Sequence, residues 1–418
     1  MKWVRWLYPG LRVKRWLAVA LTGVVSLAAG VLVAGRTGFL NGGGPTASPV
    51  LAGLLLVLLG LVLMVVGIRS MVRSLIGTLL PNRDGELVEA FYQRRLLGRG
   101  YRVVVVGGGT GISVLLRGLK EYTSNLTALV TVTDDGGSSG RLRAEMGVLP
   151  PGDIRNCLVA LADTETLMDE VLGYRFRHGY GLTGHNLGNL LLAGLTELTG
   201  SFVQAIQEVS KVLAIRGQVL PATLSQETLC AELLDGTVLE GETRITQGGS
   251  RGIRRVFLKP GDSQPVSEAL RAIAEADAVV LGPGSLYTSV IPNLLVNGIS
   301  EAICQSPGIK IYICNVMTQP GETERYAASD HLRAIYDHCG PGFIDYVIVN
   351  TQEMRRAQLR KYQEKGAQPV RVDYKALAAM GVKVVGANLL EKGELVRHDP
   401  KLLAGTVIEI IRRRGADR

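Results

Sequence analysis

Two adjacent carboxylates, Asp134 and Asp135, begin a stretch rich in residue types that bind phosphate, DDGGSSGRLR. Gly136 frees the backbone, and Ser138 and Arg141 can donate hydrogen bonds to phosphate oxygens. Paired carboxylates beside such donors can hold Mg²⁺ against a diphosphate, or one of them can accept a proton. An Asp-Gly turn without a ligand is the structural alternative, and the residues by themselves leave both interpretations open.

Two glycine-rich loops each follow an apolar run and precede a helical pattern. Unpaired N–H groups at such helix starts attract anions, so we expect the two loops to hold one pyrophosphate group. A dinucleotide fingerprint is not present, because G-x-G-x-x-G begun at Gly107 meets Ile112 and begun at Gly109 meets Val114. No G-K-[ST] follows either loop, and a glycine turn without a ligand remains the alternative. The candidate residues are Gly107, Gly108, Gly109, Thr110 and Gly111 in the first loop, and Gly282, Gly284, Ser285 and Tyr287 in the second.

Amide, imidazole and guanidinium side chains form a third group of candidates. His185 and Asn189 are four residues apart, and with Asn186 they stand where an apolar helix begins, so they share a face. A single histidine is more often a hydrogen-bonded structural residue than a catalyst. The remaining candidates, which could contact a base or sugar or cap a loop, are Asn156, Asn315, Thr318 and Arg325.

Strand and helix patterns alternate from Tyr101 onward, which predicts an α/β fold with a doubly wound, mostly parallel, Rossmann-like sheet. In such sheets ligands bind at the carboxyl ends of the strands, where the candidate loops would lie. Residues 160–260 break the alternation and predict an inserted helical and β subdomain. The expected strands are Arg102–Val106, Ala128–Thr133, Ala278–Leu281, Lys310–Cys314, Tyr346–Val349 and Val382–Val385.

Charge is unevenly distributed along the 418 residues. Residues 1–100 contain 12 of the 46 Lys and Arg and 3 of the 37 Asp and Glu, which leaves 34 of each sign in residues 101–418. A domain without net charge disfavours nucleic acid as a partner. The five cysteines form no C-x-x-C pair and no metal-ligand spacing, which is typical of reduced thiols in a cytosolic domain.

The first 68 residues predict a transmembrane hairpin. Leu17–Ala34 and Val50–Ile68 contain no charged residue, and each is long enough to nearly cross a bilayer core of about 30 Å. Basic residues precede the first span and follow the second, so both termini and the main domain are expected on the cytoplasmic side of the cell membrane. Residues 69–100 predict an amphipathic linker, with Leu87, Phe91 and Leu96 on one side, and residues 101–410 predict the ligand-binding domain.

Six motifs in a fixed order resemble one known family. They are GGGTG, DDGGSSGRLR, GDIRN, HNLGN, GPGSLYTSVIPNLL and CNVMTQPGET. This series is similar to that of the CofD/YvcK superfamily, and specifically to its bacterial gluconeogenesis-factor branch. The resemblance implies a doubly wound α/β domain that binds UDP-sugars such as UDP-N-acetylglucosamine and acts in cell shape and wall synthesis on gluconeogenic carbon sources. The hairpin departs from many members, which start near the GGGTG strand.

Applied to this sequence, the resemblance places a nucleotide diphosphate near Gly107–Gly111 and Gly282–Ser285, with Tyr287 against the base. Asp134 and Asp135 become a metal or polar-contact pair, and Asn186 and Asn189 complete the pocket. The related transferase branch implies an enzyme that passes a 2-phospholactyl group from a guanosine diphosphate conjugate to a deazaflavin with Mg²⁺. The long GPGSLYTSVIPNLL and MTQPGET motifs favour a ligand-sensing regulator, with the lipid bilayer and cell-wall synthesis proteins as partners. No cofactor is certain, and a homo-oligomer is left open.

Overall fold

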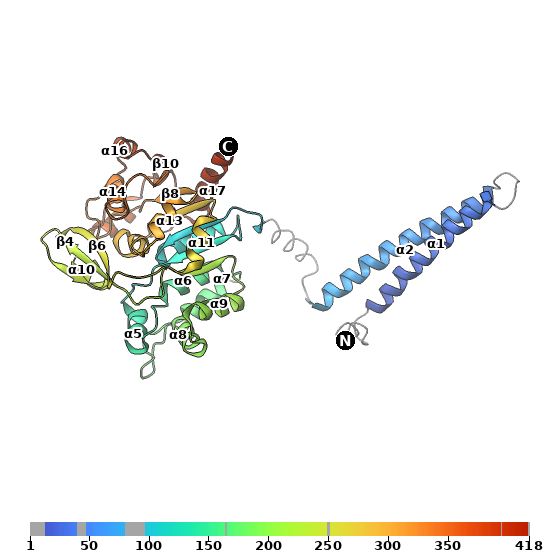
Figure 1. The fold of residues 1–418 in the computed structure, drawn as a ribbon, viewed down its shortest axis with the longest axis horizontal. Coiled ribbons are helices and arrows are strands. Elements are labelled where there is room, and N and C mark those ends of the chain that lie inside the picture. The colour runs from blue at the N-terminus through green and yellow to red at the C-terminus, as the bar shows by residue number, and fades with distance from the viewer. Residues whose placement is uncertain are drawn as a thin grey trace. The chain divides into compact units, whose positions relative to one another are not determined.

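A computed structural model describes residues 13–39, 47–79, 97–163, 165–248, 251–393 and 395–416 (Figure 1). The chain divides into two compact units, Met1–Arg94 and Arg95–Arg418, and each is described by itself.

The first unit is a pair of long helices, α1 (Val13–Phe39) and α2 (Ala47–Leu79). Their apolar stretches each span 22 residues, with mean hydropathies of 2.4 and 3.0, so both helices are long and apolar enough to cross a membrane. The helices approach closely at glycines: a Cβ atom on Gly23 would lie 2.7 Å from the carbonyl oxygen of Gly60. The flanking charges before Val13 and the predicted linker helix with Leu87, Phe91 and Leu96 lie outside the described residues.

The second unit is built on a seven-stranded sheet in the order β10-β9-β8-β7-β1-β2-β3, in which every neighbouring pair is parallel. The predicted doubly wound α/β sheet is therefore confirmed. All six expected strands are present, but β2 begins and ends earlier than expected, and β3 was not anticipated. The strands are β1 (Val103–Gly107), β2 (Leu126–Val130), β3 (Gln218–Pro221), β7 (Ala278–Leu281), β8 (Ile309–Ile313), β9 (Tyr346–Asn350) and β10 (Lys383–Ala387).

Helices cover both faces of this sheet because its strands are apolar on both faces. Val103 and Val105 of β1 face one core cluster, and Val104 and Val106 face the other. The first cluster includes side chains from α4 (Gly109–Leu119), α6 (Gly152–Leu161), α7 (Glu165–Gly173), α8 (Leu187–Thr199), α9 (Phe202–Leu213) and α17 (Pro400–Ala416). The second includes side chains from α11 (Ser267–Ala274), the π-helix η3 (Leu286–Val290), α12 (Ile291–Leu294), α13 (Ile299–Gln305), α14 (Ala328–Cys339) and α16 (Tyr374–Ala379).

A small antiparallel sheet packs beside the second core. Its strands are β4 (Thr228–Leu233), β5 (Val238–Glu240) and β6 (Ile253–Lys259), and α10 (Glu242–Gly248) follows β5. The stretch expected as one insertion thus serves two sheets, since β3 joins the main sheet and β4 to β6 form their own. Two further helices are α5 (Gly137–Met146) and α15 (Arg356–Gln363).

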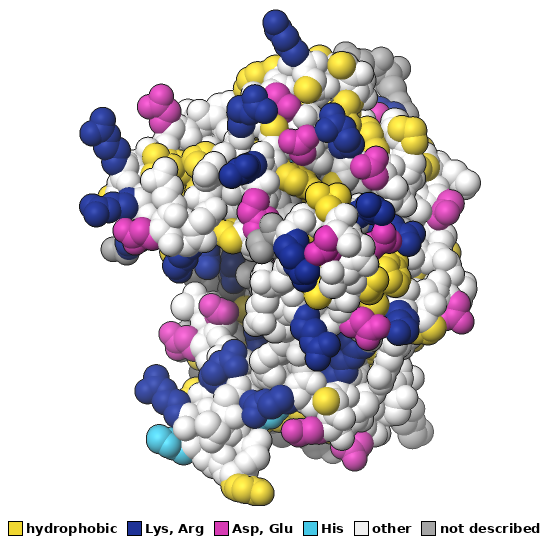
Figure 2. All heavy atoms as spheres, turned by 90° about the vertical axis from the view of Figure 1, so that its left-hand side faces the viewer, with side chains coloured by type: hydrophobic (Ala, Val, Ile, Leu, Met, Phe, Trp, Pro, Cys, Tyr) yellow, Lys and Arg dark blue, Asp and Glu magenta, His cyan; other side chains and the backbone are white. Residues whose placement is uncertain are grey.

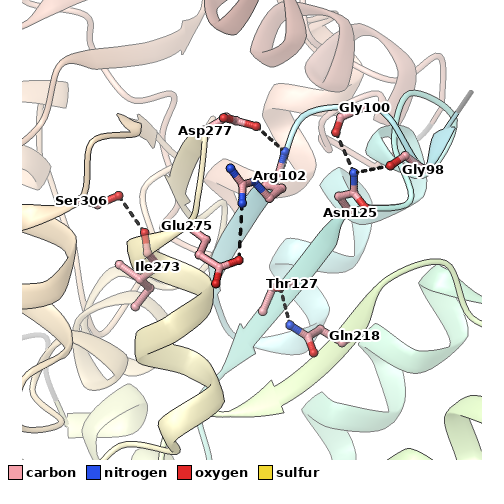
Figure 3. Close-up of polar contacts among 10 residues, drawn as sticks. All are labelled: Gly98, Gly100, Arg102, Asn125, Thr127, Gln218, Ile273, Glu275, Asp277 and Ser306. Atoms are coloured by element: carbon pink, nitrogen blue, oxygen red, sulfur yellow. Dashed lines mark hydrogen bonds and ion pairs between the residues drawn. The ribbon is translucent and has the colours of Figure 1, made fainter.

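The amino-terminal ends of the strands are tied together by polar contacts (Figure 3). The backbone N–H of Arg102 donates to Asp277 at 2.8 Å, and the Asn125 amide donates to the carbonyl of Gly100 at 2.7 Å. On the face in Figure 2, acidic and basic side chains are interspersed, in keeping with the balanced charge of this domain. The loops predicted to bind a ligand lie at the opposite, carboxyl edge of the sheet.

Candidate functional site

A cleft of about 780 Å³ opens at the carboxyl ends of β1, β7 and β8. These strands are neighbours at the centre of the sheet, and the connections leaving β1 and β7 run to opposite sides. Ligands of open α/β sheets bind at such a switch point. Residues that border the cleft include Thr110, Gly111, Arg117, Arg155, Asn156, Asp169, Gly284, Ser285, Asn315, Thr318, Gln319, Tyr362, Lys365, Arg397 and His398.

The first glycine loop is shaped by contacts with the chain itself. A Cβ atom on Gly109 would lie 2.1 Å from the carbonyl oxygen of Asp153, so only glycine fits there. The Asp153 carboxylate lies beside the backbone N–H groups of Gly109 and Thr110 at the start of α4, which favour its charged form. Removal from water and the nearby Asp134 raise the pKa of Asp153 to about 6. The anion position at this helix start therefore holds a side chain of the protein.

A buried carboxylate also lies beside the second glycine loop. Oε1 of Glu322 accepts from the hydroxyl of Thr288 at 3.2 Å and from the amide of Gln319 at 2.6 Å, and its Oε2 has no hydrogen-bond partner among the described residues. Burial raises the pKa of Glu322 to about 7. Asn315 holds the loop before the helix, because its amide accepts from the N–H of Gly284 at 3.3 Å and donates to its carbonyl at 2.8 Å.

The two glycine loops border the same cleft and touch each other, since a Cβ on Gly111 would lie 2.2 Å from the carbonyl oxygen of Pro283. The carboxylates of Asp153 and Glu322 lie beside the N–H groups expected to hold a pyrophosphate. Binding of a pyrophosphate at these loops stays a prediction.

Basic side chains supply the charge that an anionic ligand needs. Among the described residues that border the cleft, Arg117, Arg155, Lys365 and Arg397 are basic and Asp169 is acidic. A diphosphate is complementary to such a surface, because guanidinium groups bind phosphate oxygens with paired hydrogen bonds. The cleft volume is also within the range of about 300–1,000 Å³ that small-molecule sites occupy.

Arg155 is fixed on the cleft wall by two amides. Its Nη1 donates to Oδ1 of Asn189 at 2.8 Å, and its Nη2 donates to Oδ1 of Asn156 at 2.7 Å. The amide nitrogen of Asn156 in turn donates to the hydroxyl of Thr110 at 3.2 Å. The structure thus brings two predicted residues, Thr110 and Asn156, to the cleft in one hydrogen-bonded group.

Three other predicted residues lie behind this group rather than in the cleft. His185, Asn186 and Asn189 are buried, with 2%, 4% and 2% of their surfaces exposed, and they do not border the cleft. Ser138 joins them, since its Oγ lies 3.0 Å from Nδ1 of His185 and 3.1 Å from the amide nitrogen of Asn189. These residues are therefore one hydrogen-bonded layer behind the cleft wall, and their contact with a ligand stays a prediction.

Asp134 and Asp135, the predicted metal or polar-contact pair, also do not border the cleft and bond to different parts of the chain. Asp134 accepts from the N–H of Gly136 at 2.9 Å, whereas Asp135 accepts from the N–H and hydroxyl of Thr243 at 3.0 and 2.7 Å. Asp135 therefore ties the loop after β2 to α10. Among the described residues, no group of three or more His, Cys, Asp and Glu side chains could hold a metal ion.

The remaining predicted residues are divided between the cleft and the core. Ser285, Asn315 and Thr318 border the cleft, with the Ser285 hydroxyl donating to Gln319 at 2.7 Å. Tyr287, which the resemblance sets against a base, is 2% exposed in the core, its hydroxyl lies 2.9 Å from that of Tyr326, and burial raises its pKa. Arg141 donates to the carbonyl of Thr183 at 3.0 Å, and the exposed Arg325 does not border the cleft.

The sequence predictions missed one side of the cleft. Tyr362 and Lys365 come from α15 and the turn after it, and Arg397 and His398 come from the segment before α17. No glycine-rich strand ending marks these positions, because they reach the cleft through long-range packing rather than at a strand tip. The sequence signal that could have indicated this side of the cleft was a basic residue near an aromatic residue, as in the RKYQEK stretch.

The parallel sheet and the basic cleft at its carboxyl edge define a doubly wound α/β domain with a cleft at the switch point. Residues 103–390 match the family model described as 2-phospho-L-lactate transferase CofD, and the chain belongs to the CofD family.

Relatives of two lengths resemble the chain. Gluconeogenesis factors from Halalkalibacterium halodurans and Bacillus subtilis are 53% and 49% identical over 73% and 76% of this chain, which are 95% and 100% of those proteins. A Nostoc relative is 46% identical over 98% of this chain and 92% of its own length, so its similarity includes the helical hairpin region. A crystal structure of a Bacillus halodurans protein has 53% identity and a TM-score of 0.72 over 75% of this chain and 100% of its own. Proteins that lack the first unit therefore fold as this α/β domain.

Proposed function

We propose that the α/β domain binds a nucleoside diphosphate sugar, with UDP-N-acetylglucosamine as the first ligand to test, and acts as a regulator rather than as an enzyme. The observation that carries this proposal is the cleft at the switch point, with four basic side chains against one acidic side chain. Two phosphates would neutralise most of this charge, and the remaining volume would accept a base and a sugar.

The biological setting follows from the family. Similar proteins are named gluconeogenesis factors, so the ligand would report carbon status to cell-wall synthesis and cell shape. The apolar helices α1 and α2 would anchor the domain on the cytoplasmic side of the cell membrane. Anchoring would raise the concentration of the domain near membrane-associated cell-wall enzymes.

Calorimetric titration of residues 95–418 with UDP-N-acetylglucosamine tests the proposal, and we expect saturable binding. Replacing Lys365 or Arg397 by alanine should weaken binding about tenfold or more, since a hydrogen bond to a charged group contributes about 1.5–3 kcal/mol. The matched control is Arg254→Ala, because this exposed arginine lies on β6 and pairs with Glu232 outside the cleft. No heat of binding up to millimolar ligand would end the proposal.

Phospholactyl transfer is the alternative, because the matching family model is described as a transferase. The carboxylates that would assist it, Asp134 and Asp135, bond to backbone and Thr243 outside the cleft. Incubation with Mg²⁺, a guanosine diphosphate phospholactate donor and a deazaflavin distinguishes the two: release of GMP would establish the transferase, and its absence would support the regulator.

A further inference from the structure

A chain of hydrogen bonds runs from His185 to Arg155 directly behind the cleft. Nδ1 of His185 lies 3.0 Å from Oγ of Ser138, which lies 3.1 Å from Nδ2 of Asn189. Oδ1 of Asn189 accepts from Nη1 of Arg155 at 2.8 Å. His185, Ser138 and Asn189 are each less than 5% exposed, so no solvent competes for these bonds.

The direction of every bond in this chain follows from Arg155. A guanidinium group donates only, so the oxygen of the Asn189 amide must face Arg155 and its nitrogen must donate to Ser138. The N–H of Asn186 also donates to Ser138 Oγ, at 3.3 Å, so the hydroxyl oxygen accepts twice. The hydroxyl proton of Ser138 must therefore be donated to His185, so Nδ1 of His185 accepts this hydrogen bond. His185 is therefore neutral, with its proton on Nε2.

The helix that carries Asn189 is shaped to receive the stem of Arg155. A Cβ atom on Gly188 would lie 2.7 Å from Cδ of Arg155 and 2.9 Å from the carbonyl oxygen of Leu172. Any other residue at this position would push the arginine away. The HNLGN segment, residues 185–189, thus supplies both the space and the acceptor for one guanidinium group.

We propose that His185, Ser138 and Asn189 are positioning residues that hold the Arg155 guanidinium in the cleft, and that they do so only while His185 is neutral and accepts from Ser138. The inference rests on the proposed function in one respect: Arg155 is taken to contact the anionic ligand.

Protonation of His185 breaks the chain. A second N–H at Nδ1 would face Ser138 Oγ, whose two lone pairs already accept, and the hydroxyl would lose its own acceptor. The charged groups around the imidazole are Arg141, Arg175 and Glu145. Loss of water and the two arginines lower the pKa of His185, and Glu145 opposes them, so the neutral form dominates at neutral pH. Around Arg155 the charged groups are Arg175, Asp153, Asp169 and Asp134.

A double-mutant cycle separates positioning from a general structural role. Arg155→Ala and Ser138→Ala should each weaken binding of UDP-N-acetylglucosamine to residues 95–418, the first about tenfold or more. If Ser138 acts through Arg155, the effect of Ser138→Ala should disappear in the Arg155→Ala background. Fully additive effects would overturn the inference. His178→Gln is the control for histidine loss, because His178 is exposed, and it should bind like the wild type.

A measurement without ligand keeps the inference testable if the proposed function fails. Nitrogen-15 NMR of the His185 side chain should report the tautomer with the proton on Nε2, and a proton on Nδ1 at neutral pH would overturn the inference whether or not a nucleotide sugar binds. The order parameter of Arg155 Nε should fall in Ser138→Ala and stay unchanged in His178→Gln; an unchanged value in Ser138→Ala would also overturn it. Absence of wild-type binding would remove the proposed function alone.

Discussion

Both helix starts that face the cleft carry a carboxylate of the chain, and this placement has an electrostatic consequence. Asp153 and Glu322 belong to a cluster of acidic side chains around Glu242. The carboxyl group of Glu242 interacts electrostatically with Asp134, Asp153, Glu322 and Asp135. Burial and these neighbours raise the pKa of Glu242 to about 9 from an ordinary value of 4.5. A carboxyl group with a raised pKa keeps its proton in the folded state while the unfolded chain loses it.

Glu242→Gln should therefore stabilise the domain at alkaline pH. Between pH 4.5 and 9 the folded state binds more protons at Glu242 than the unfolded state, so the free energy of unfolding falls as pH rises through this window. Asp153 and Glu322 contribute in the same direction, but around lower pKa values of about 6 and 7, so Glu322 still titrates just above pH 7. The difference between the wild type and Glu242→Gln from pH 7 to 9 therefore isolates Glu242, with an upper limit of about 1.4 kcal/mol per pH unit.

Urea denaturation of residues 95–418 at pH 7 and 9 measures this effect. The wild type should lose stability over the interval, and Glu242→Gln should lose less. Glu240→Gln is the control on the same hairpin, since hydrogen bonding to Lys259 lowers the pKa of this exposed carboxylate. Equal losses in the wild type and in Glu242→Gln would contradict a raised pKa at Glu242.

Side-chain positions were harder to predict from the sequence than the location of the site. Thr110, Ser285 and Asn315 were predicted and do border the cleft, because residues just after parallel strands meet at one edge, and Asn156 reaches it from α6. Tyr287 was assigned to a base but turns into the core, since its η3 helix presents that side to α14. Spacing along the chain gives the edge of the sheet at which a residue lies, but not the direction of its side chain.

At the scale of elements, a strand could be predicted from the sequence only where its hydrophobic pattern was strong. The valine run of β1 is buried on both faces and was anticipated within one residue. The four residues of β3 end in a proline and follow a helix pattern, so no alternation marked them as part of the main sheet. Its place beside β2 depends on pairing across 91 residues, from Thr127 to Gln218, which no local pattern encodes.

Contact between α4 and α17 depends on a glycine, and its replacement should be damaging. A Cβ atom on Gly118 would lie 1.9 Å from the carbonyl oxygen of Pro400 and 2.6 Å from Cβ of Ala404. The α17 backbone would have to move, so Gly118→Ala should destabilise the domain by about 1–3 kcal/mol through overpacking. Thermal unfolding followed by circular dichroism measures the change.

Gly194→Ala is the matched control within another helix. Gly194 is exposed in α8, and a Cβ atom there would have no neighbour within 4 Å. Alanine favours a helix interior over glycine by about 1 kcal/mol, so this variant should melt at the same temperature as the wild type or higher. If Gly118→Ala were as stable as Gly194→Ala, close packing of α17 on α4 would not be needed.

At the scale of the whole molecule, two units with different surfaces share one chain. Exposed leucines and valines cover α1 and α2, whereas the α/β domain has a surface of mixed charge (Figure 2). Where α1 and α2 pack, Gly30 lies against Gly53 and Gly23 lies against Gly60. Close approach at small residues is typical of helices that pair in lipid. Relatives that match the α/β domain alone indicate that this fold does not depend on the two apolar helices.

The hairpin should place the α/β domain on the cytoplasmic side of the membrane. Cys304 is exposed on this domain, so a maleimide that cannot cross membranes should label it only after bacterial spheroplasts expressing the full chain are permeabilised. In a Cys304→Ser background, Asn41→Cys between the two spans should be labelled in intact spheroplasts, because the basic flanks keep both termini inside.

Residues 95–418 expressed alone should stay in the soluble fraction, whereas the full chain should sediment with membranes after alkaline extraction. Labelling of Cys304 in intact spheroplasts would reverse the orientation, and extraction of the full chain into the soluble fraction would show that the apolar helices do not span a bilayer.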